Sequence, residues 1–91
     1  MKWVEIIKLR SAGIGSGLRE ELLLPSGEPG QNGPVEMKAY RHAGLDTDWS
    51  VHLHWDSERP EQNGSALGLR LARAMKEYGL VDHSVWIEEG E

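Results

Sequence analysis

Two histidines, His52 and His54, lie two residues apart in a segment where apolar and polar side chains alternate, residues 49–55. This alternation predicts a β-strand, in which residues two apart point to the same side with Cα atoms roughly 6.5–7 Å apart. Neutral imidazoles can act as general bases, so we take His52 and His54 as the candidate catalytic residues. With His42 as a third ligand they could instead hold a divalent metal ion, and a further interpretation is that solvent-facing strand positions simply tolerate histidine.

Three more side chains share the parity of the histidines and are candidates for binding a substrate. Tyr40, His42 and Trp86 fall on even positions of predicted strands, and the two aromatic side chains could stack on a flat aromatic ligand. Packing in a protein interface is the alternative role for Tyr40 and Trp86. The sequence does not choose between these roles.

The elements that would position these side chains are expected in the order strand, helix, strand, strand, helix, strand. Strands are predicted at residues 2–10, 35–42, 49–55 and 82–88, and helices at 17–24 and from a cap at Asn63 or Ser65 to a stop at Gly79. A loop rich in Pro and Gly at 25–34 and an acidic tail at 88–91 complete the chain. This order is the split βαβ, or ferredoxin-like, arrangement of a single α+β domain over 1–91, with a four-stranded antiparallel sheet and both helices on one face.

The two faces of the predicted sheet differ in character. Odd positions of the last three strands are mostly apolar and should face the helices, whereas even positions carry the histidines, Tyr40 and Trp86. The first strand has apolar residues on both parities, so either Val4 with Ile6 or Trp3 with Ile7 joins the second face. An exposed patch of this kind predicts a partner surface, and the simplest partner is a second copy of the chain.

The composition limits the classes of function. The 91 residues include no Cys, which excludes disulfides, thiol nucleophiles and thiolate metal sites. A formal net charge of −5 opposes binding to a phosphate backbone, so no nucleic-acid partner is expected. The amino terminus lacks the pattern of a signal peptide, and no apolar stretch approaches the roughly 20 residues that span a bilayer. We therefore expect a cytoplasmic protein without a membrane partner.

The element order, the length and the closing stretch from Tyr78 to Trp86 resemble the dimeric α+β barrel superfamily, particularly domains like the antibiotic-biosynthesis monooxygenases. The resemblance implies a homodimer and, for the enzymes of the family, cofactor-independent oxidation of aromatic or quinol substrates. Its haem-degrading members carry an Asn in the first strand, where this chain has Glu5 as its candidate polar residue. No cofactor is therefore expected.

Three functions follow as expectations. The first is a small homodimeric intracellular domain that binds a small molecule or acts as a scaffold. The second is a cofactor-independent monooxygenase-like enzyme with His52 or His54 as the base, and the third is a histidine-based metal-binding protein.

Overall fold

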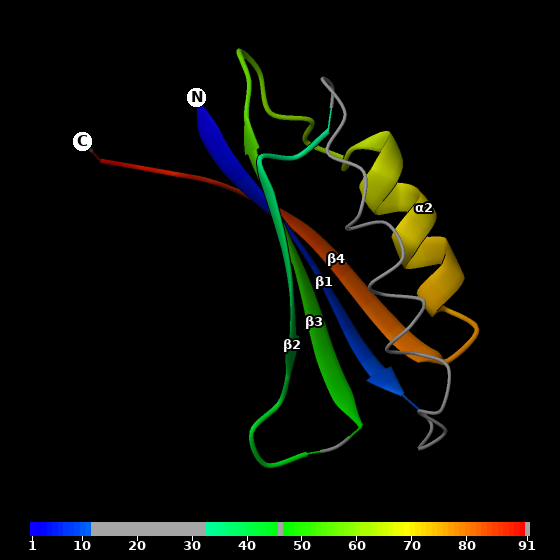
Figure 1. Ribbon diagram of the computed structural model, residues 1–91. Helices are drawn as coiled ribbons and strands as arrows, with labels where there is room; N and C mark the ends of the chain where they lie inside the picture. The colour runs from blue at the N-terminus through cyan, green and yellow to red at the C-terminus, as the bar shows by residue number, and fades with distance from the viewer. Residues whose placement is uncertain (12–32, 46, 91) are drawn as a thin grey trace.

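The computed structural model describes residues 1–11, 33–45 and 47–90, which form an antiparallel sheet with a helix on one face (Figure 1). The strands are β1 (Lys2–Ser11), β2 (Glu36–Arg41), β3 (Asp48–Asp56) and β4 (Gly79–Ile87), and the helix is α2 (Ala66–Met75). The sheet order is β2-β3-β1-β4, and β1 pairs with both β3 and β4. Within the described ranges, no helix is long and apolar enough to cross a membrane.

The two-helix ferredoxin-like prediction is wrong. In the described part of the chain the sheet carries a single helix, α2, so the domain is mostly sheet. The helix predicted at 17–24 and residues 25–32 of the predicted loop lie outside the described residues. That helix prediction depended on a segment of about eight residues, shorter than the roughly 12–15 that an isolated helix needs. The dimeric barrel fold drawn from the family resemblance requires two helices on the sheet, whereas the described residues provide one, α2.

The four strands and the hairpin between β2 and β3 are confirmed, with one correction at β4. This strand begins at Gly79 instead of Asp82, and α2 ends at Met75. Gly79 is therefore not a left-handed helix stop, and its φ is not positive. A Cβ there would lie 2.0 Å from the carbonyl oxygen of Arg10, so the close approach of β1 and β4 requires glycine at this position.

The core lies between the sheet and α2, on the face predicted from the odd positions. Its buried side chains come from three elements: Ile7 and Leu9 of β1, Val51 and Leu53 of β3, and Leu71, Ala72 and Met75 of α2. The sequence left open which side of the first strand faces the core. The odd residues of β1 are buried, so this side faces α2. Val4 and Ile6 therefore lie on the opposite face.

Candidate functional site

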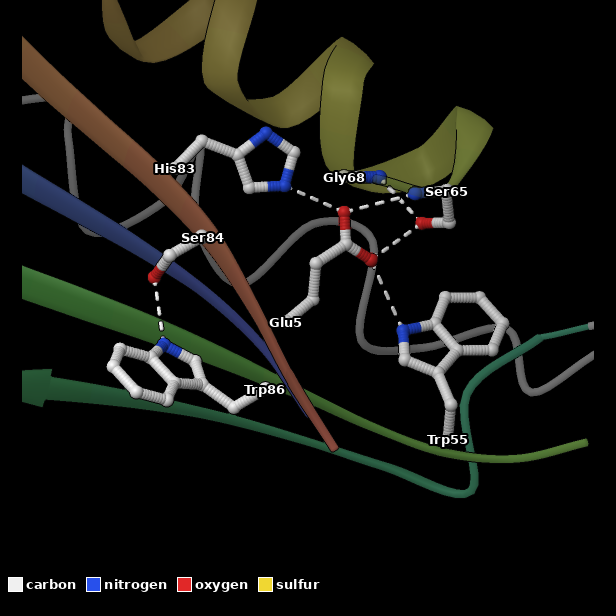
Figure 2. Close-up of polar contacts among 7 residues, drawn as sticks. All are labelled: Glu5, Trp55, Ser65, Gly68, His83, Ser84 and Trp86. Atoms are coloured by element: carbon white, nitrogen blue, oxygen red, sulfur yellow. Dashed lines mark hydrogen bonds and ion pairs between the residues drawn. The ribbon is translucent and has the colours of Figure 1, made fainter. Parts of the chain in front are cut away.

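We call the sheet face turned away from α2 the open face (Figure 1). The odd positions of β1 and β3 are buried against α2, so the even positions point to the open face, and the registers bring most of the predicted site residues together there. In the strand registers Val4 is opposite both His54 and Trp86, and Ile6 is opposite His52. Trp86 is 58% exposed and Tyr40 is 45% exposed, although both are large and aromatic. The Trp86 indole N–H donates a hydrogen bond to Ser84 Oγ at 2.8 Å, which holds the ring along β4 (Figure 2).

Tyr40, His52 and His54 form a row of rings across the middle of the open face. The ring centroids of Tyr40 and His52 are 4.7 Å apart, and those of His52 and His54 are 6.4 Å apart. His52 Nε2 also shares a hydrogen bond of 2.8 Å with Ser50 Oγ. The predicted proximity of the two histidines is therefore present, and Tyr40 adds to it from β2.

The environment of His52 alters the acidity of its imidazole. Partial burial lowers the pKa of His52 below its ordinary value of 6.5, and the neighbouring charges of His54 and Lys8 lower it further. Each of these causes disfavours the imidazolium form. The lowered pKa favours the neutral imidazole of His52, which can accept a proton or a hydrogen bond.

Two hollows lie toward opposite ends of the open face. One, of about 610 Å³, is at the end near the β2–β3 hairpin and includes Tyr40, His42 and Leu80 in its lining. The other, of about 490 Å³, includes His54 and Trp86. The candidate substrate-binding residues are thus divided between the hollows, and His52 lines neither of them. Among the described residues, a base at His52 therefore lies between the two hollows and outside both of them.

The three histidines of the metal hypothesis do not converge. His42 Nδ1 accepts a hydrogen bond of 2.9 Å from the backbone N–H of Gly44, beyond the end of β2. Across residues 1–11, 33–45 and 47–90, no group of three His, Asp or Glu side chains is arranged to hold a metal ion. The open face offers an aromatic and imidazole surface for a ligand.

A second cluster of polar residues lies on the other side of the sheet, around Glu5. This side chain is fully buried, and its carboxylate accepts hydrogen bonds from Trp55 Nε1 at 3.1 Å, Ser65 Oγ at 2.7 Å and the Ser65 backbone N–H at 3.0 Å. His83 Nε2 lies 2.6 Å from its Oε2 atom (Figure 2). The buried charge is thus satisfied by β3, β4 and the start of α2, as burial of a carboxylate requires.

The start of α2 is built around this carboxylate. Ser65 caps the helix by accepting a hydrogen bond of 2.9 Å from the backbone N–H of Gly68. The Ser65 hydroxyl in turn donates a hydrogen bond to the Glu5 carboxylate. A Cβ at Gly68 would lie 1.7 Å from Glu5 Oε2. Glycine is therefore needed at Gly68 to make space for the carboxylate, and the contact fixes α2 on the sheet.

The Glu5 cluster is the polar site that the sequence did not reveal. The signal in the sequence was that Glu5 lies between Trp3 and Ile7 on a side of the first strand that is otherwise apolar. His83 is opposite the buried Ile7 and so lies on the helix side of β4, where its contact with Glu5 gives it a structural role. The arrangement differs from a hydrolytic triad because the carboxylate, and not the imidazole, contacts the serine hydroxyl. Its geometry serves to hold the helix.

Comparison with known proteins found no matching family model, no matching curated protein and no matching solved structure. The inference of function therefore depends on the geometry of the chain itself.

Proposed function

We propose that this chain is a cytoplasmic homodimeric domain that uses its open face to bind a second copy and encloses small-molecule sites in the process. The observation that carries the proposal is the exposure of Trp86 and Tyr40 beside the half-buried Val4 and Ile6 on one sheet face. A monomer would leave this apolar and aromatic surface in water, which is unfavourable by roughly 25 cal/mol for each Å² of apolar area.

The hollows support the ligand-binding part of the proposal. Their volumes, about 610 and 490 Å³, are within the range of roughly 300–1,000 Å³ that is typical of small-molecule pockets. Each combines aromatic or aliphatic walls with polar groups, as such pockets commonly do. Covering the open face with a second sheet would turn each surface hollow into a closed cavity.

Sedimentation equilibrium tests the dimer directly. We expect the wild-type chain to be dimeric at micromolar concentration and the Trp86→Glu variant to dissociate. A charge in place of a large aromatic side chain that packs in the interface should weaken the dimer at least about 30-fold, since such anchors contribute about 2 kcal/mol or more.

The matched control is Leu69→Glu, which places the same charge at a residue of α2 that is 49% exposed and lies off the open face. This variant should dimerise like the wild type. A wild-type chain that stays monomeric at 100 µM, or equal weakening by both substitutions, would refute the proposal.

A second candidate function is favoured by the lowered pKa of His52. In a dimer the neutral imidazole could take a proton from the hydroxyl of a quinol bound near Tyr40, and the resulting anion could react with dissolved O₂, one oxygen atom entering the quinone product and the other leaving as water. Oxygen uptake with a dihydroxynaphthalene should then exceed autoxidation and fall to that background in His52→Ala. Uptake at the background rate with the wild-type dimer would remove this candidate.

A further inference from the structure

We infer that the second copy lies on the open face about a twofold axis parallel to the strands and between β1 and β3, so that each of its strands runs in the same direction as the same strand of the first copy; we call this the parallel arrangement. This inference rests on the proposed dimer and adds its orientation. It follows from the placement of charges on the open face, which complement a second copy in this arrangement and oppose it in the reversed one.

The relevant charges lie at the two ends of the central strands. At the hairpin end, Arg10 of β1 is opposite Asp48 of β3, and their side chains form an ion pair of 3.5 Å. At the other end, Lys2 of β1 is opposite Asp56 of β3 in the same register. Both ends therefore carry a cation on β1 and an anion on β3.

A twofold axis along the strands leaves the direction of every strand unchanged and places β1 of one copy over the antiparallel β3 of the other. Arg10 then faces Asp48 of the second copy, and Lys2 faces Asp56 of the second copy. By symmetry each contact occurs twice. Aligned sheets cross at about 30°, which displaces the strand ends by several Å, and side chains as long as Arg10 and Lys2 can span that distance.

A twofold axis across the strands gives the opposite result. Each strand would then lie over its own copy in the reversed direction, so that Arg10 faces Lys2 and Asp48 faces Asp56 of the second copy. Lys38, which is level with Ile6 and His52 at the middle of the sheet, would face its own copy. Like charges brought together in an interface disfavour this arrangement.

Four further contacts of the parallel arrangement are also compatible. β2 lies over β4 of the second copy, which brings the hydroxyl of Tyr40 toward the carboxylate of Asp82. Ile6 meets the ring of His52, and Val4 meets His54. Each hollow then faces the same hollow of the second copy, so both closed cavities take residues from two chains.

Mixing two variants with reversed charges tests the orientation. Arg10→Glu leaves two anions at the hairpin end, and Asp48→Arg leaves two cations there. In the parallel arrangement each variant alone is a poor homodimer, whereas the mixed dimer restores two attractive contacts. We expect the mixed dimer to be tighter than either homodimer by on the order of tenfold, measured by sedimentation equilibrium of the separate and mixed chains.

A substitution that lowers the stability of one chain does not affect the conclusion, because the same two chains are compared alone and mixed. The control is a mixture of the Arg70→Glu and Glu77→Lys variants, which change exposed positions in α2 and just after it. This mixture should show no preference for the mixed dimer over the two homodimers. If the wild type is dimeric and the Arg10 and Asp48 variants mix at random, the orientation is wrong while the dimer stands. If the wild type is monomeric, the proposed function itself fails.

Discussion

Replacing Gly68 by Ala sets two physical effects against each other. In a helix interior, Ala is better than Gly by about 1 kcal/mol, so helix propensity alone predicts a more stable protein. In this fold the new Cβ would lie 1.7 Å from Glu5 Oε2 and 2.4 Å from its carboxyl carbon. The carboxylate must move, although it is buried among its donors and has no solvent to replace them.

The size of the effect follows from the hydrogen bonds that Glu5 would lose. Moving the carboxylate away from the start of α2 breaks its bonds to the hydroxyl and the backbone N–H of Ser65. Hydrogen bonds to charged groups contribute about 1.5–3 kcal/mol each, so two of them amount to about 3–6 kcal/mol. After subtracting the gain in helix propensity, we expect Gly68→Ala to lower the free energy of unfolding by about 2–5 kcal/mol.

Urea unfolding followed by tryptophan fluorescence measures this change. Arg70→Ala, at an exposed position of the same helix, is the control and should alter stability by less than about 0.5 kcal/mol. Combining Gly68→Ala with Glu5→Ala removes the clash, so in that background the Gly68 substitution should stabilise by about 1 kcal/mol. A Gly68→Ala protein as stable as the wild type would refute the proposed role of Glu5.

Three further predictions concern the same cluster and the open face. Ser65→Ala removes both the helix cap and a donor to Glu5 and should lower the free energy of unfolding by about 2–5 kcal/mol, measured by urea unfolding. Gly64→Ala should destabilise by about 1–3 kcal/mol, because Gly64 has a φ of 100° and a Cβ there would lie 2.4 Å from His83 Cε1. In an NMR titration His52 should show a pKa below 6.5 that rises in Lys8→Ala. Because its folded pKa is lowered, the contribution of His52 to stability is complete above pH 6.5 and is lost as the pH falls through the folded value.

Local patterns in the sequence were sufficient for part of the fold. Alternation in β3 placed Val51 and Leu53 on the buried face and His52 and His54 on the other, because the two-residue period of a strand leaves no other choice. The helix cap is Ser65, one of the two caps expected from the sequence, Asn63 and Ser65. A hydroxyl side chain directly before an apolar helical pattern is typical of a cap. The shared location of Tyr40, His52, His54 and Trp86 follows from the same rule.

The tertiary structure alone decided the rest. The parity of β1 depended on its pairing with β3 and β4, because both of its faces are apolar in the sequence. The Glu5 cluster combines residues that are up to 78 positions apart, so no local pattern could reveal that Glu5 and His83 meet. Likewise, the division of the open face into two hollows depends on how four strands lie side by side. Strand periodicity determined which way each side chain points, and only the packing of distant segments determined what it meets there.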